Sequence, residues 1–254
     1  MNSKAIRAGF AALALVLMQS PAFAQEDPSD NYAQMWRFDI KPGMYNDFMQ
    51  AFSQHIAWRR ENGETWTWMT YMPLAGERMY SVWVRSDGHT LADFDTYAEY
   101  GRKAEEHWFG TVDQYVGSYE SWISQTVETL EFWPEDTQFE LFQAFTYHVK
   151  PGFERQFDEA AKMVHDGLVK VSWNEPHSFD RLISGAGGYL MTLVLPYRNF
   201  ADMAEPEKTF DEALAEAYGE KRAGELMMQI AESYGEVEEV LVRVDREHSI
   251  TLDN

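Results

Sequence analysis

The sequence contains no cysteine and few cationic side chains. Its 254 residues include 21 Lys and Arg against 42 Asp and Glu. Without thiols there is no disulfide framework, no thiolate nucleophile and no Cys-ligated zinc or iron–sulfur cluster. A formal net charge of −21 would repel nucleic-acid phosphates and anionic lipid headgroups over most of the surface. The composition therefore argues against nucleic acid as a partner and leaves stability to core packing.

Long apolar runs are missing beyond the N-terminus. Residues 1–24 combine two cations, a short apolar stretch and a final Ala-Phe-Ala motif, which is the pattern of a secretory signal peptide. The apolar stretch is about half of the roughly 20 residues that a membrane-spanning helix needs. We expect cleavage near Ala24, a polar segment at 25–30, and a periplasmic or secreted protein that is not inserted in a membrane.

The rest of the chain contains an internal repeat. Lys-Pro-Gly stands at 41–43 and again at 150–152, and the same spacing of about 109 residues pairs Gly76 with Gly185. A period of this length suits a duplicated small domain better than a solenoid unit. We therefore predict two modules, at 31–135 and 136–247, and a C-terminal tail at 248–254.

Both modules show the same order of predicted elements. In the first, period-two alternation predicts strands at 35–40 and 65–72, and apolar residues spaced by four predict an amphipathic helix at 44–56. A turn at 73–77, a strand at 79–84, a helical region at about 91–122 and a closing strand at 127–133 follow. The second module repeats this order, with its second helical region at about 200–234 and its last strand at 237–244. The order βαββαβ is that of the ferredoxin-like unit.

A ferredoxin-like unit carries helices on one face of its sheet, so its other face must be buried. In a tandem duplication the second copy can cover that face. We predict an α+β fold whose two antiparallel sheets pack as an intramolecular pseudo-dimeric α/β barrel, with a higher oligomer left open. The strand, Lys-Pro-Gly and helix openings at 36–52 and 145–161 resemble the dimeric α/β-barrel superfamily, which includes antibiotic-biosynthesis-type monooxygenases and NIPSNAP-type proteins. The resemblance implies the fold and leaves the function open, because this superfamily hosts many activities.

Tryptophan is unevenly distributed between the modules. Eight of the nine Trp residues precede the linker near 133–136, and only Trp173 follows it. Packing alone would use similar numbers in two copies, so we hypothesise a cleft for a small hydrophobic or aromatic molecule in the first module. The alternative is that Trp fills a larger core there. In the superfamily, ligands lie between helices and sheet, which implies these pocket walls: Trp36, Phe38, Trp66, Trp68, Trp83 and Phe94.

One constellation carries a chemical hypothesis. Phe94, Tyr97 and His107 resemble the Phe-x2-Trp-x9-His spacing with which haem-degrading monooxygenases of this superfamily place an aromatic residue and the axial histidine. The resemblance implies His107 as a haem ligand and Tyr97 as the aromatic residue, and a neutral imidazole can bind ferric haem. The chain departs from the motif at Trp36, where the family has Asn. Two glutamates precede His107, which is typical of an exposed helix, so a packed or solvent-facing histidine is the alternative.

Polar residues alternate with the predicted walls on the first strand. Arg37 and Asp39 should face the barrel interior, and His148 occupies the position of Asp39 in the second module. We expect the three to form a polar interior cluster that is structural or transfers protons. No metal-binding or nucleophile motif recurs, and no cofactor is assigned apart from haem as the alternative.

Three function classes remain open at this stage. The first is a binding protein or a cofactor-independent enzyme, monooxygenase-like or isomerase- or lyase-like, that acts on a small apolar molecule in the Trp-rich cleft. The second is haem binding or haem degradation through His107. The third is a non-catalytic envelope interaction module, which predicts a filled cleft.

Overall fold

The computed structural model describes residues 31–134, 137–185 and 187–252, so the predicted signal peptide and the segment at 25–30 lie outside the described residues. The first half contains β1 (Tyr32–Ile40), α1 (Tyr45–Glu61), β2 (Met69–Gly76), β3 (Ser81–His89), α2 (Leu91–Thr111) and β4 (Val116–Thr126). The second half contains β5 (Leu141–Val149), α3 (Glu154–Lys170), β6 (Ser178–Ser184), β7 (Tyr189–Tyr197), α4 (Phe210–Tyr218), α5 (Glu220–Ser233) and β8 (Tyr234–Val244). Short 3-10 helices lie at Asp113–Tyr115, Glu128–Leu130 and Phe200–Met203.

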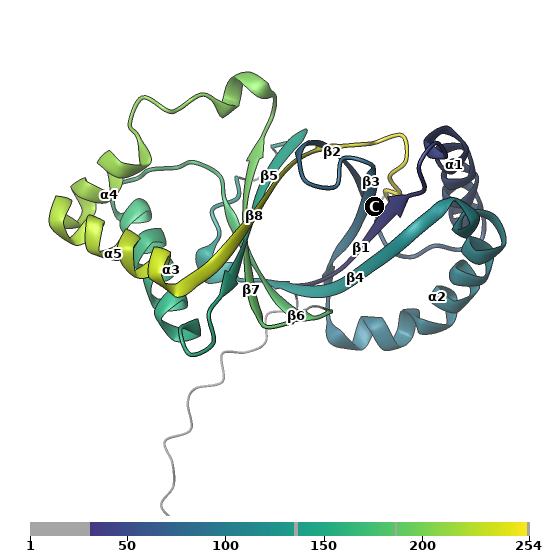
Figure 1. Ribbon diagram of the computed structural model, residues 1–254, viewed down its shortest axis with the longest axis horizontal. Coiled ribbons are helices and arrows are strands. Elements are labelled where there is room, and N and C mark those ends of the chain that lie inside the picture. Colours follow the sequence, from purple (N-terminus) through teal and green to yellow (C-terminus); the bar gives the residue numbers. More distant parts are fainter. Residues whose placement is uncertain (1–30, 135–136, 186, 253–254) are drawn as a thin grey trace, which may run out of the picture.

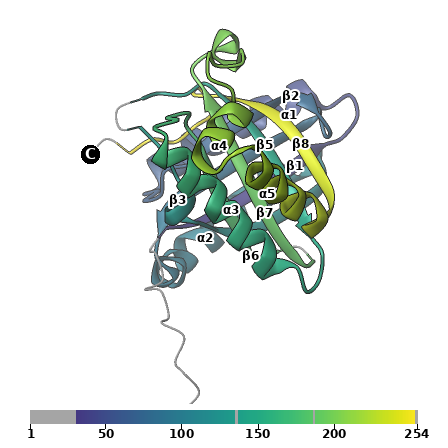
Figure 2. The ribbon, with the colours of Figure 1, turned by 90° about the vertical axis from the view of Figure 1, so that its left-hand side faces the viewer.

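The eight strands form one closed antiparallel barrel in the order β1-β3-β2-β8-β5-β7-β6-β4. Each half contributes four neighbouring strands, and the two halves join where β2 pairs with β8 and β4 pairs with β6. Helices α1 and α2 cover one side of the barrel, and α3, α4 and α5 cover the opposite side (Figure 1). Figure 2 shows the second group lying across the outer face of the strands. The predicted α+β class and the barrel architecture are therefore confirmed.

Three of the predicted elements differ from the structure. The helical region expected at 91–122 ends at Thr111, and the closing strand is β4 at Val116–Thr126 and not 127–133, where Glu128–Leu130 forms a 3-10 helix. β4 pairs along its length with β1 and at its end with β6, so these long-range pairings, and no clear apolar alternation in its own sequence, fix the segment as a strand. In the second half, the helical region expected at 200–234 is divided into a 3-10 helix, α4 and α5.

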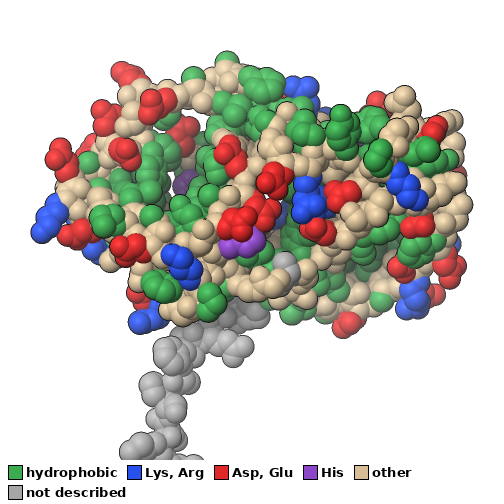
Figure 3. Space-filling model, viewed as in Figure 1, with side chains coloured by type: hydrophobic (Ala, Val, Ile, Leu, Met, Phe, Trp, Pro, Cys, Tyr) green, Lys and Arg blue, Asp and Glu red, His purple; other side chains and the backbone are tan. Residues whose placement is uncertain are grey.

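The surface is predominantly acidic, as the composition requires. Acidic side chains are spread over both halves of the face seen in Figure 3, with fewer basic side chains among them. Among the residues that the structure describes, no helix is long and apolar enough to cross a bilayer.

The C-terminal segment, residues 245–252, returns from β8 to the first half (Figure 1). Trp68 and Ile250 exchange backbone hydrogen bonds of 2.8 and 2.7 Å. The backbone N–H of Thr70 donates to Ser249 Oγ, and the Thr70 hydroxyl donates to the carbonyl of His248. This segment, predicted as a tail from 248 onward, therefore extends the first half beside β2.

The two seams between the halves place backbone against backbone. A Cβ added at Gly76 would lie 2.4 Å from the carbonyl oxygen of Glu239, on the opposing strand β8. A Cβ added at Gly185 would lie 2.4 Å from the carbonyl oxygen of Ser121 on β4. Both glycines also have positive φ angles, of 100° and 119°, which other residues rarely adopt. Each seam therefore closes around a residue that has no side chain.

We expect Gly76→Ala and Gly185→Ala each to lower the free energy of unfolding by about 3 kcal/mol, because the added methyl group meets a backbone and φ is unfavourable. Urea denaturation followed by circular dichroism measures the change. Gly224→Ala in α5 is the matched control, since nothing lies within 4 Å of its Cβ position. Replacement there should be neutral or stabilise by about 0.5–1 kcal/mol. Unchanged stability in both seam variants would contradict the close approach.

Candidate functional site

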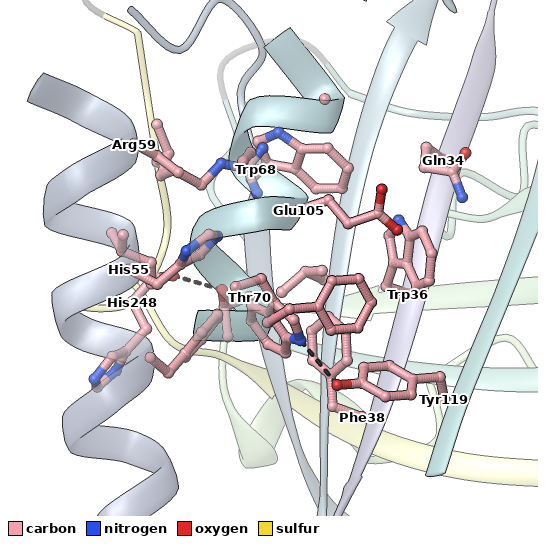
Figure 4. Close-up of a pocket in the computed structure, with 18 of the residues that line it drawn as sticks. Gln34, Trp36, Phe38, His55, Arg59, Trp68, Thr70, Glu105, Tyr119 and His248 are labelled. Atoms are coloured by element: carbon pink, nitrogen blue, oxygen red, sulfur yellow. Dashed lines mark hydrogen bonds between the residues drawn. The ribbon is translucent and has the colours of Figure 1, made fainter. Parts of the chain in front are cut away.

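A cavity of about 370 Å³ lies between the helices and the sheet of the first half. Figure 4 shows its lining side chains, which come from α1, α2, the strands and the C-terminal segment. Most of the lining is apolar. The apolar walls are Trp36, Phe38, Phe52, Ile56, Trp68, Val84, Trp108, Phe109 and Ile250.

The cavity exists because α2 packs loosely on the sheet. The 21 residues of α2 bury only Ala104 and Trp108, whereas the 17 residues of α3 bury five. Period-two alternation on β1 turns Trp36 and Phe38 toward α2. The rings of Phe38 and Trp108 lie 4.5 Å apart at the floor, and Phe109 is 57% exposed, which places it at the mouth.

A buried ion pair closes one end of the cavity. Arg59 Nε donates to Glu64 at 2.6 Å, and Arg59 Nη2 donates to the Tyr97 hydroxyl at 2.6 Å. The Tyr97 hydroxyl in turn donates to Glu64 at 3.0 Å, and burial raises the pKa of Tyr97. The guanidinium of Arg59 also lies 4.8 Å from the centre of the Trp68 ring. The positive charge of Arg59 is therefore already neutralised inside the protein.

Two imidazoles are hydrogen-bonded beside this ion pair. His55 on α1 and His107 on α2 approach with their Nδ1 atoms 2.9 Å apart, and the His107 ring stacks on Trp58 at 4.3 Å. His55 is only 2% exposed, and burial, with smaller effects of Arg59 and His107, lowers its pKa from 6.5 to about 3. Burial also lowers the pKa of His107. Both rings are therefore neutral at neutral pH.

His248 lines the cavity from the C-terminal segment. Its Nδ1 lies 2.7 Å from Asp245 and its Nε2 lies 2.8 Å from the hydroxyl of Ser53. This is the order of acid, base and hydroxyl used by serine hydrolases. However, Ser53 lies within α1, where the backbone N–H groups that would stabilise an oxyanion bond inside the helix, and its hydroxyl also donates to the carbonyl of Met49. The trio therefore anchors the C-terminal segment to α1.

The structure brings only some of the predicted pocket residues together. Trp36, Phe38, Trp68 and Tyr97 line the cavity. Trp66 lies behind the wall, stacked 3.9 Å from Tyr97, and Phe94 packs edge-on against Trp66. The cavity lining also includes His55, His248 and Ile250, which sequence reasoning did not single out. His55 gave no signal apart from its place on an amphipathic helix.

Trp83 is a correction to the predicted pocket. Alternation on β3 turns Val82 and Val84 toward the helices and Trp83 into the barrel. There the Arg37 guanidinium lies 5.7 Å from the Trp83 ring centre, and Trp122 packs edge-on against it.

His107 is a second correction. It does not line the cavity, because its ring lies between α1 and α2 with Nδ1 directed at His55. The ring of His55 thus lies between the cavity and His107, the residue predicted as a haem ligand.

The polar interior cluster divides into two groups. Arg37 lies 3.5 Å from Asp39 and also pairs with Glu120, while His148 lies 2.8 Å from Glu238. The side chains of Asp39 and His148 are 30% and 36% exposed, whereas the side chain of Arg37 is only 6% exposed. Among the described residues, His148 makes no ion pair or hydrogen bond with Arg37 or Asp39.

We expect His55 to make the protein acid-sensitive. Because its folded-state pKa of about 3 lies below its ordinary 6.5, the unfolded chain binds a proton more readily between these values. Stability should therefore fall as the pH is lowered from 6.5 toward 3, by on the order of 4 kcal/mol. Urea denaturation of the wild type and His55→Leu across this range measures it, and the variant should show the flatter dependence. An equal dependence in both proteins would contradict a neutral buried His55.

Comparisons with known proteins identify the fold. No protein-family model and no curated protein matches the sequence. An anthrone oxidase-like protein has a similar structure, with a TM-score of 0.54, 12% identity and coverage of 85% of this chain and 92% of its own. A proposed monooxygenase from Lactobacillus acidophilus NCFM matches with a TM-score of 0.52 and 9% identity, over 88% of this chain and 100% of its own. A mutant chlorite dismutase from Candidatus Nitrospira defluvii matches with a TM-score of 0.53 and 8% identity, over 86% and 92%.

These three proteins belong to the dimeric α/β-barrel superfamily. At such low identity the likeness shows the fold alone. It agrees with the resemblance seen in the sequence, and it leaves the activity to be argued from the cavity.

Proposed function

We propose that the protein binds a small, flat aromatic molecule in the first-half cavity and acts on it as a cofactor-independent enzyme of the monooxygenase or isomerase type. The cavity itself carries this proposal. Its volume of about 370 Å³ falls within the range of small-molecule sites, roughly 300–1,000 Å³, and its walls are mostly aromatic rings. The envelope-module alternative predicts a filled cleft, so the cavity favours a ligand.

The polar groups of the lining indicate what the ligand carries. Arg59 is paired with Glu64, and His248 is held by Asp245 and Ser53, so neither offers an unpaired charge. By contrast, Nε2 of His55 makes no hydrogen bond with any described residue. A mainly apolar ligand with one hydroxyl or carbonyl group matches this lining. The lining also holds the carboxylate of Glu105 and the buried Nε1–H of Trp68, which has no hydrogen-bond partner among the described residues. Proton removal from such a ligand needs a base, and we assign this role to His55 because it is the buried imidazole of the lining.

Haem does not fit the described lining. Its predicted ligand, His107, lies outside the cavity, and the volume is at the small end of the range for ordinary ligands. Two haem propionates would also need cationic partners, whereas Arg59 is already committed to Glu64. We therefore derive no reaction step through haem.

The proposal also includes export of the protein and an origin by tandem duplication. The signal-peptide pattern at 1–24 supports a periplasmic or secreted location. The matching order of elements in the two halves supports an origin by tandem duplication, with module boundaries near 135 and 247.

A bulky side chain inside the cavity should block binding. We expect Ala104→Phe to weaken the affinity for naphthalene-type ligands at least tenfold, about 1.4 kcal/mol, because Ala104 is buried in the lining. Quenching of tryptophan fluorescence measures the affinity. Ala98→Phe, on an exposed position of the same helix, is the control and should bind as the wild type does. If no aromatic ligand quenches or stabilises the wild type, the proposal fails.

Haemin titration separates the haem alternative from the proposed function. We expect no Soret band of bound haem, since the described cavity offers neither the space nor the cationic partners. A Soret band that appears in the wild type and is lost in His107→Ala would restore the haem assignment, and one lost only in His55→Leu would move the ligand to His55.

A further inference from the structure

Two imidazoles stand in series between the cavity and the outside of the helix pair. His55 lines the cavity and is almost fully buried, while its Nδ1 lies 2.9 Å from Nδ1 of His107. His107 is only partly buried, between α1 and α2. The Nε2 atom of His55 has no protein partner among the described residues. One hydrogen bond thus links an imidazole of the cavity lining to a partly exposed imidazole between α1 and α2.

We propose that His55 and His107 form a proton relay, in which His55 deprotonates a hydroxyl group of an aromatic ligand and His107 passes the proton to solvent. This inference rests on the proposed function and names its ligand class, small aryl alcohols such as phenols and naphthols. Neutral imidazole suits the role because one ring nitrogen accepts a proton while the other donates one.

Each proton in the proposed relay moves from a named donor atom to a named acceptor atom. In the starting state, Nδ1–H of His55 donates to Nδ1 of His107, and Nε2 of His55 carries a lone pair. The ligand O–H bond breaks toward Nε2, leaving its electron pair on oxygen. The Nδ1 proton of His55 moves to Nδ1 of His107, which then releases its own Nε2 proton to water. Both rings end neutral, with the proton of His55 on Nε2 and that of His107 on Nδ1, and the reverse sequence returns a proton to the product.

Burial explains why two histidines serve better than one. A lone His55 would become a cation inside an apolar cavity, and its pKa of about 3 shows how unfavourable that charge is. In the relay, the charge falls on His107 instead. That ring stacks on Trp58 with centroids 4.3 Å apart, where an aromatic face stabilises a cation. His55 is thus the catalytic residue of the proposal, and His107 is a positioning and relay residue.

Excited-state proton transfer from 2-naphthol tests the relay directly. Excitation makes 2-naphthol a strong acid, so emission from the naphtholate reports a proton acceptor beside the bound probe. We expect bound 2-naphthol to show naphtholate emission in the wild type and to lose it in His55→Leu. In His107→Phe the emission should fall sharply while the probe remains bound. His165→Phe is the matched control, because His165 and His177 form a similar imidazole pair, 3.0 Å apart, in the second half.

Two results would overturn the relay. Naphtholate emission that persists in His55→Leu would exclude His55 as the acceptor. Emission that is undiminished in His107→Phe would show that His55 acts alone. Either result leaves aromatic binding intact, since the probe is still bound.

Nitrogen-15 NMR of the ligand-free protein gives an independent readout. The relay requires one proton shared between the two Nδ1 atoms, visible as scalar coupling across the hydrogen bond, and the absence of that coupling would overturn it. If the coupling is present and 2-naphthol does not bind, the aromatic-ligand proposal fails and the relay of ligand protons fails with it, while the hydrogen-bonded pair stands. The two failures are thus distinguishable.

Discussion

The fold depends on the close approach of backbones at the two seams that join the halves. Gly76 and Gly185 admit the opposing carbonyl groups, so the eight strands can close without a free edge. Closure fixes the register of each strand, and a slip by one residue would exchange its two faces. With the register fixed, Trp36 and Phe38 face the helices while Arg37 and Asp39 face the interior. The cavity walls are therefore set by the barrel, although none of the described residues that pair across the seams lines the cavity.

The two halves share one topology but differ in how closely their helices pack on the sheet. In the first half, the single long helix α2 buries two residues and leaves room above the sheet. In the second half, α4 and α5 bury Ala213, Leu214, Ala217, Ala223 and Leu226, so this helical layer packs more closely. The excess of tryptophan in the first half serves several purposes. Trp36, Trp68 and Trp108 line the cavity, whereas Trp58 supports His107 and Trp83 fills the barrel.

Local sequence patterns predicted the barrel architecture, but they predicted only some of the residues that line the cavity. Repeated Lys-Pro-Gly turns and period-two strands were enough for the α+β barrel, and alternation on β1 placed Trp36 and Phe38 correctly toward the helices. The β4 strand was missed because its alternation mixes Tyr and Trp with Ser, Gly and Glu. His107 was misplaced because spacing along one helix does not fix which neighbour it faces. His248 reaches the cavity through contacts between residues nearly 200 positions apart, which no local pattern contains.

The C-terminal segment makes the cavity depend on both halves of the chain. His248 and Ile250 form one wall of the cavity, yet they follow the entire second half in the sequence. The segment at 245–252 is held beside Trp68 by backbone hydrogen bonds, and it follows a strand, β8, that pairs with β2. An enclosed cavity therefore requires both halves of the chain to be in place, although its walls belong mainly to the first half.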